Sequence, residues 1–325
     1  MRPNDLVWSG RGATYGLLLA VPGTVVIATG HVKPGVELLV GTLVAAIVGV
    51  YPSRARRKAM LVVGLLFALS ISLGALLATA PWLAVPGIAV VALAAAHAAA
   101  EKPLGILAMN LCLPIMGIGF SYDVAGAVGF GLLIVAGTIY GYLLSLAFKE
   151  YPSPPAPDRG MLTRDEARRY GVVLALTAFT SALAGFTLNV DHPGWVVGAA
   201  LLVIRPGHEL QRIRSIGRIV AVYIGALLAA PLIVFGAPGW VFAIAAPAAL
   251  VGVAAMHTSR WYINAGFTTF LVIIVLTYGE SGSVLHFVSE RTAETLIGVG
   301  IAYFFGLAVP SIVESRFQAR RRQPR

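Results

Sequence analysis

The sequence predicts an all-α polytopic membrane protein with about twelve transmembrane helices, arranged as two parallel six-helix repeats with both termini in the cytoplasm. The first reason is composition: of 325 residues, 58% are hydrophobic and 12% are charged, and the mean hydropathy is +0.84. A soluble domain carries about 25% charged residues. The second reason is a series of apolar runs, and the third is the gathering of basic residues on alternate connections between them.

The apolar runs are counted against the thickness of a bilayer, which a helix crosses with about 20 residues. Between charged residues and Pro or Gly breaks, the first half holds six runs, at about 13–30, 35–51, 59–79, 83–100, 104–121 and 124–148. The second half holds six more, at about 170–188, 193–205, 216–235, 238–257, 261–279 and 284–309. No cleavage site stands out near the basic start of the chain, so the first run is expected to act as its own insertion signal.

The charges on the connections predict the orientation of these runs. Basic residues lie on alternate connections, at 54–58, 102, 149–169, 205–218 and 260, whereas the intervening connections carry few cations. Lys and Arg are enriched in cytoplasmic loops. Because both ends of the chain are also basic, both termini are expected in the cytoplasm, with an even number of crossings.

The run at 193–205 is too short for a full crossing. Its apolar residues make about 17 Å of helix. Two interpretations stay open: a half-helix that faces protein or a water-filled cavity, or a tilted helix that its flanks extend. Broken or short helices are common along the substrate route of transporters.

The two halves of the chain resemble each other in sequence and in the order of their features. Each has a basic loop containing Pro, then the sequence GALLA (74–78 and 225–229), then a histidine, His97 or His257. We therefore expect one six-helix repeat at 1–148 and a second at 170–310. A Pro-rich cytoplasmic linker at 149–169 joins them, and a basic cytoplasmic tail follows at 311–325.

Several other classes of function are excluded by the residue inventory. The net charge of +10 is spread in short clusters between apolar runs, which argues against a nucleic-acid partner. One cysteine, Cys112, allows no intramolecular disulfide. No phosphate-binding loop, no His/Cys cluster with metal-ligand spacing and no acidic pair for Mg²⁺ is present, so we expect no enzyme, no cofactor and no metal site.

The second half resembles the FUSC-type family, the fusaric acid resistance and aromatic acid exporter proteins of the inner membrane. Three segments carry the resemblance: IRPGHELQRIRSIGRIVAVYIGALLA (204–229), SRWYINAGFTTFLVIIVLT (259–277) and ERTAETLIGVGIAYFFGLAVP (290–310). In the first, Arg218 and Gly225 match the ends of the family motif. In the last, Glu294 stands for the acid, and three residues match: Arg291, Thr295 and Gly298.

The resemblance implies a secondary transporter in the cell (inner) membrane that exports small organic anions, such as aromatic carboxylic acids, coupled to protons. In a Gram-negative host it also implies a periplasmic adaptor protein as a partner. Since two repeats complete a permeation unit within one chain, a monomer suffices and a homodimer stays open.

The last run carries the principal candidate residues, because ionisable groups within a membrane are costly and point to function. His286, Glu290 and Glu294 are spaced i, i+4, i+8 and share one helix face. Arg291 is expected to bind a substrate carboxylate and these three to carry the coupled proton. The alternative is a structural pair between Arg291 and Glu294 that neutralises itself.

Further candidates lie at helix ends and on the eleventh run. Arg218 enters its helix in the family motif and is a second candidate for binding the substrate. Asn264 and Thr268 form a polar stripe on the eleventh run, with Tyr262 at its interface end, and all three are candidates for the substrate path. Because imidazole is the side chain suited to exchanging protons near neutral pH, His97 and His257 are candidates for proton coupling, or else they cap helix ends.

Two other functions keep the same architecture. A passive anion channel needs the arginines but no titrating acid, whereas a membrane scaffold protein needs none of these groups for transport. Neutralising Glu294 separates the transporter from the channel, and the absence of any flux favours the scaffold.

Overall fold

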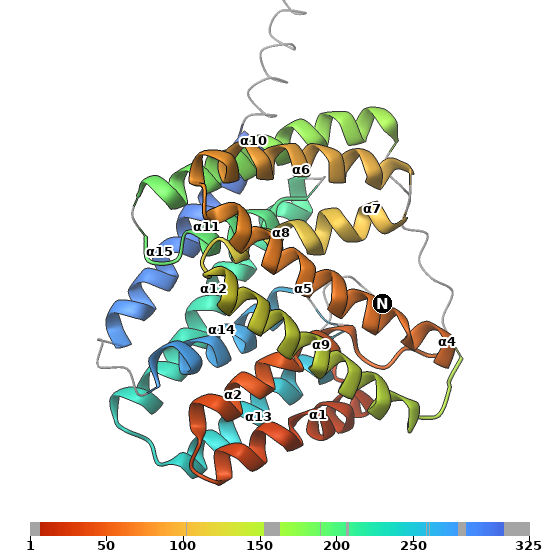
Figure 1. Cartoon of the computed structure of the whole chain (residues 1–325), viewed down its shortest axis with the longest axis vertical. Helices are drawn as coiled ribbons and strands as arrows, with labels where there is room; N and C mark the ends of the chain where they lie inside the picture. The colour runs from red at the N-terminus through yellow and green to blue at the C-terminus, as the bar shows by residue number, and fades with distance from the viewer. Residues whose placement is uncertain are drawn as a thin grey trace, which may run out of the picture. The chain divides into compact units, whose positions relative to one another are not determined.

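The computed structural model describes residues 7–101, 103–152, 163–188, 190–205, 208–257, 259, 261–278 and 284–308, and these residues form helices joined by short connections, with no strand among them (Figure 1). Two segments are π-helical, η1 (Ala108–Cys112) and η2 (Phe304–Ala308). The α-helices in chain order are α1 (Gly10–Ala28), α2 (Val32–Gly41), α3 (Leu43–Val48), α4 (Arg54–Arg57), α5 (Ala59–Ala78), α6 (Pro81–Glu101), α7 (Pro103–Leu107), α8 (Leu113–Gly119), α9 (Val124–Leu146), α10 (Arg164–Thr187), α11 (Pro193–Val203), α12 (His208–Val234), α13 (Gly239–Ala255), α14 (Trp261–Thr277) and α15 (Val284–Tyr303).

Each of the twelve predicted runs contains helix, which confirms the all-α prediction. Among the residues that the structure describes, six helices are long and apolar enough to cross a membrane: Gly10–Ala28, Arg54–Ala78, Pro81–Glu101, Val124–Leu146, Arg164–Thr187 and Arg212–Val234. Four apolar helices are shorter, at Gly105–Gly119, Pro193–Val203, Gly239–Ala255 and Ile263–Thr277. Twelve crossings and cytoplasmic termini remain predictions.

The chain forms two compact units, and each takes helices from both halves of the sequence. The first unit contains Met1–Leu69, Ala125–Arg159 and Gly217–Thr292, and the second contains Ser70–Val124, Gly160–Ile216 and Ala293–Arg325. Four helices, α5, α9, α12 and α15, contribute residues to both units. The predicted division into two sequential repeats stays a prediction, and residues 153–162 of the expected linker and the whole basic tail lie outside the described residues.

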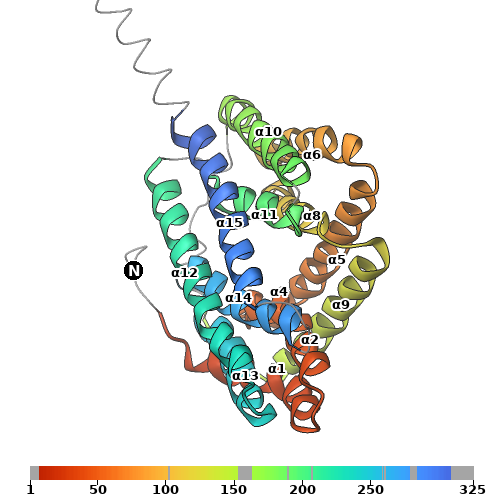
Figure 2. The ribbon, with the colours of Figure 1, turned by 90° about the vertical axis from the view of Figure 1, so that its left-hand side faces the viewer.

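Within the units, the first helix of one half packs on the fourth helix of the other. In the first unit α1 lies against α13, and in the second unit α10 lies against α6 (Figures 1 and 2). Glycines make the first contact close: a Cβ on Gly12 or Gly16 would collide with the backbone of α13 at Ala254 or Val251. The core of the first unit includes Leu19, Phe242 and other buried apolar side chains of α1, α2, α13 and α14.

The short run at 193–205 is a short helix enclosed in the second unit. α11 has 11 residues, about 16 Å of helix, and nearly all of them are buried. It ends because Ile204 is extended, with φ −62° and ψ 129°. Its flanks therefore do not lengthen it, and of the two interpretations the structure supports the half-helix that faces protein.

The carboxyl end of α11 is capped by a side chain. The Arg205 guanidinium donates to the carbonyl oxygens of Leu201 (3.2 Å) and Ile204 (2.7 Å), and the Tyr170 hydroxyl also donates to Ile204 (3.2 Å). The last carbonyls of a helix lack intrahelical donors, and here these two side chains supply them. Burial lowers the pKa of Arg205, and the adjacent Tyr170 partly offsets that effect.

A second arginine closes the carboxyl end of α9 in the first unit. The Arg57 side chain is fully buried, and its guanidinium donates to the carbonyl oxygens of Tyr51 (3.0 Å), Phe148 (2.9 Å) and Ser145. Arg57 belongs to the basic cluster at 54–58, but its hydrogen bonds give it a structural role.

Replacing Arg57 tests this role. We expect Arg57→Gln to lower the free energy of unfolding by about 2 kcal/mol, because several buried carbonyl oxygens lose a charged donor. Arg56→Gln is the matched control, since Arg56 is exposed on the same short helix. Thermal unfolding of the purified protein in detergent measures both, and equal losses in the two variants would contradict the capping role.

Candidate functional site

The candidate groups of α15 share one face of the helix, and their exposure falls along it. His286, Glu290 and Glu294 are one turn apart on the continuous helix Val284–Tyr303. The exposed fraction of the side chain is 62% at His286, 11% at Glu290 and 1% at Glu294. The row of groups therefore leads from an exposed histidine to a fully buried carboxyl group.

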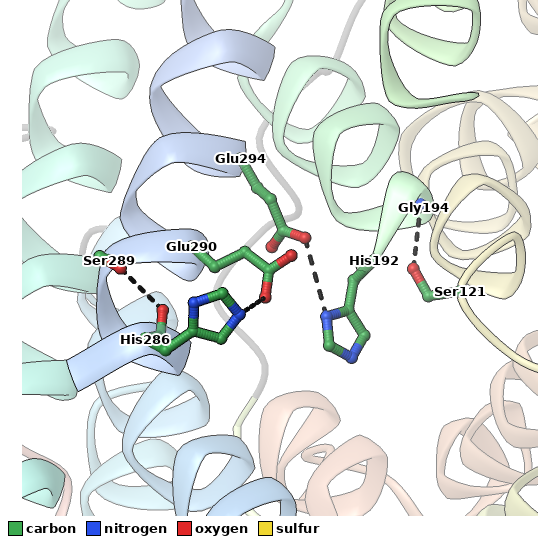
Figure 3. A network of polar contacts seen from close by, with 7 residues as sticks. All are labelled: Ser121, His192, Gly194, His286, Ser289, Glu290 and Glu294. Atoms are coloured by element: carbon green, nitrogen blue, oxygen red, sulfur yellow. Dashed lines mark hydrogen bonds and ion pairs between the residues drawn. The ribbon is translucent and has the colours of Figure 1, made fainter. Parts of the chain in front are cut away.

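The exposed end of this row is a histidine–carboxylate contact. Nε2 of His286 lies 3.8 Å from a carboxyl oxygen of Glu290 (Figure 3). The Ser289 hydroxyl donates to the carbonyl oxygen of His286 at 2.8 Å. The contact becomes an ion pair when the imidazole is protonated.

The buried end of the row meets a residue that the sequence analysis missed. Nδ1 of His192 lies 3.8 Å from Oε1 of Glu294, and both residues belong to the second unit (Figure 3). His192 is 22% exposed and immediately precedes α11. The signal that could have found it is its place: it opens the one predicted run that is too short to cross a bilayer.

Small residues hold the start of α11 beside α15. Gly298 packs against the α11 backbone, where a Cβ would collide with the carbonyl oxygen of Val196. On another side, Gly194 donates its N–H to the Ser121 hydroxyl at 2.9 Å (Figure 3). A Cβ on Gly194 would lie 2.5 Å from the carbonyl oxygen of Gly117 in α8. Because α11 is fixed between α8 and α15, His192 is fixed beside Glu294.

This pair can hold and exchange a proton. A buried carboxyl group is costly as an isolated anion, and a neighbouring imidazolium offsets that cost. Either the imidazole or the carboxyl group can carry a proton, so the pair can exist as an ion pair or as two neutral groups. Arg291 and Thr295, on the same helix, are also buried, with 6% and 1% of their surfaces exposed.

A second group of candidates lies in the first unit, on α12 and α14. Arg218 is 6% exposed, and one to two turns further along α12 a Cβ on Gly225 would collide with the backbone of Gly266 in α14. The Thr268 hydroxyl donates to the carbonyl oxygen of Ala265 (3.1 Å), so the hydroxyl oxygen of Thr268 can still accept a hydrogen bond. Oδ1 of Asn264 is buried, with no hydrogen-bond donor among the described residues. The side chain of Tyr262 lies outside the described residues.

The two histidines at corresponding helix ends differ in environment. Nδ1 of His257 lies 2.8 Å from the carbonyl oxygen of Ala254. Its ring also fills the space beside Gly49, whose φ of +68° suits glycine. His97 is exposed near the end of α6. For His257 the structure supports the helix-capping alternative.

The comparison with known families identifies the second half of the chain. Residues 174–305 match the model of the family described as fusaric acid resistance protein-like. The resemblance predicted from the sequence is thereby confirmed over these residues. The match runs from α10 into η2 and includes His192, Arg218 and Glu294. No curated protein and no solved structure matches the chain.

The match covers less than half of the chain, so it supports the family resemblance of this segment. The six long apolar helices of the described residues are those expected of a polytopic membrane protein.

The contact between α15 and α11 leads to a stability prediction. We expect Gly298→Ala to lower the free energy of unfolding by about 1–3 kcal/mol, because the methyl group would be forced into the α11 backbone. Gly300→Ala is the control, since a Cβ at Gly300 meets no atom within 4 Å. Thermal unfolding compares the two, and an unchanged melting temperature for Gly298→Ala would contradict the close packing.

Proposed function

We propose that the protein is a proton-coupled secondary transporter that exports small organic anions, such as aromatic carboxylic acids, across the inner membrane. The observation that carries the proposal is the contact between the buried Glu294 and His192, within a segment that matches a transport-related family. A passive pore needs no buried acid, because it binds no proton in its cycle. In a scaffold protein a buried acid would lower the stability without serving any function.

The proton is held on either Glu294 or His192, whose Oε1 and Nδ1 lie 3.8 Å apart. When His192 is protonated and Glu294 is ionised, the two form an ion pair. With a further proton on Glu294, the pair is cationic, and with none it is anionic. Each change of protonation alters the charge of a buried site, and the binding of an anion elsewhere in the protein responds to that charge. This response couples proton movement to anion movement.

Glu290 and His286 lead from Glu294 toward the exposed end of α15. Their exposed fractions, 11% and 62%, give protons a path between the buried carboxyl group and water. A periplasmic adaptor protein in a Gram-negative host and a homodimeric assembly are further parts of the proposal, and they rest on the family resemblance.

The test is transport by the purified protein in liposomes, with p-hydroxybenzoate as the probe and an imposed pH gradient. We expect wild type to accumulate the acid and Glu294→Gln to show no gradient-driven accumulation, because the amide cannot carry the proton. His192→Gln should slow accumulation without abolishing it. Glu101→Gln is the matched control, because Glu101 is an exposed carboxylate at the end of α6.

Two outcomes would overturn the proposal. Downhill flux that is insensitive to the pH gradient and unchanged in Glu294→Gln would favour a passive channel. No flux of p-hydroxybenzoate, benzoate or salicylate by folded wild-type protein would favour the scaffold.

A further inference from the structure

Two arginines of the chain, one buried and one partly buried, are stabilised by backbone carbonyls. Arg57 is fully buried, and its Nε and Nη1 donate to the carbonyl oxygens of Tyr51 and Phe148. Nη1 of Arg205 donates to two carbonyl oxygens at the end of α11. Both lie beside a helix terminus, where carbonyls without intrahelical donors are available.

Arg218 lies away from such a terminus and lacks these acceptors. It is in the second to third turn of α12 and only 6% exposed, so it is as deeply buried as the groups that carbonyls stabilise. Its Nε has no acceptor, and among the described residues the whole guanidinium makes no hydrogen bond or ion pair.

Toward the carboxyl end of α12, the described neighbours of Arg218 offer it no polar side chain. The face of α12 that continues from it holds Ala221, Val222 and Gly225, which have no polar side chain. Along this face α12 meets the backbone of Gly266 in α14. The carbonyls there are mid-helix and already accept intrahelical hydrogen bonds. A buried guanidinium among such neighbours is costly unless an anion from outside the chain reaches it.

Exposure relieves little of that cost. A snorkelling arginine buries its stem and leaves its charged end in water. Arg212, nearly two turns earlier on the same helix, is exposed, whereas Arg218 is 6% exposed and its Nε is buried.

We propose that Arg218 binds the carboxylate of the transported acid, with Nε–H and one Nη–H donating to its two oxygens. This inference rests on the proposed function and deepens it, because it identifies Arg218 as the charged residue that recognises the anionic substrate. The guanidinium is planar and presents two parallel donors that match a carboxylate, which an ammonium does not. The ligand class is therefore a monocarboxylate, and its uncharged amide is rejected because it leaves one donor facing an NH₂ group.

The test measures KM for benzoate in liposomes of neutral phosphatidylcholine, with benzamide as the uncharged probe. We expect Arg218→Gln to raise KM about tenfold or more, because a charge-assisted pair of hydrogen bonds is lost. Arg218→Lys should recover only part of the affinity, since it keeps the charge without the two parallel donors. Arg212→Gln, the same change of charge at an exposed position of α12, should leave KM unchanged. Benzamide should not compete with benzoate.

A second measurement keeps this inference separate from the transport proposal. Isothermal titration calorimetry of the purified protein with benzoate reports binding even where no transport occurs. Binding by wild type, lost in Arg218→Gln and partly restored in Arg218→Lys, supports the site whatever the flux assay gives. Transport with an unchanged KM in Arg218→Gln would overturn the site and leave the transport proposal standing. If Arg218→Gln fails to fold, the comparison of Arg218→Lys with Arg212→Lys decides.

The same assay separates a substrate from a lipid. An arginine near a membrane surface can also bind the phosphate of an anionic lipid headgroup. An effect of Arg218→Gln that appears only when the vesicles contain phosphatidylglycerol would assign Arg218 to the lipid and overturn the carboxylate site. An effect of the same size in neutral vesicles supports it.

Discussion

A polar group that this apolar chain buries is costly without a partner, because neither lipid nor a packed core supplies one. The helix ends show how this is done. Arg57 supplies donors to the carbonyls that end α9, Arg205 does the same for α11, and the Ser121 hydroxyl accepts the N–H of Gly194 at the other end of α11. These side chains let a helix of only 11 residues begin and end inside the second unit.

The short helix then determines where the chemistry lies. Because α11 starts inside the second unit, the residue before it, His192, is placed deep enough to reach a buried carboxyl group. Gly298 brings α15 against the α11 backbone, and Glu294, one turn before that glycine, faces the imidazole. The pairing therefore depends on where α11 begins.

The sequence predicted the parts of this arrangement that depend on local pattern. Apolar runs and their breaks predicted the helices, including the short one, and the spacing of His286, Glu290 and Glu294 predicted their common face. The partner His192 was not predicted, because it lies 102 positions from Glu294 in the sequence. A contact at such a separation produces no periodic pattern of apolar and polar residues. For the same reason the packing of α1 on α13 and of α10 on α6 was missed. The role of Arg57 was hidden within a basic cluster that looks like any cytoplasmic loop.

The buried charges of the chain fall into two kinds, and the difference is physical. Arg57 and Arg205 donate to carbonyl oxygens that would otherwise lack donors. These hydrogen bonds offset the cost of burying each guanidinium. Glu294 and Arg218 complete no helix end. Oε1 of Glu294 lies 3.8 Å from an imidazole nitrogen, and Nε of Arg218 has no acceptor among the described residues. Ionisable groups buried in a membrane protein are costly, and such groups are those that bind or carry ions. In the transport cycle proposed above, the carboxyl group carries the proton and the guanidinium binds the carboxylate.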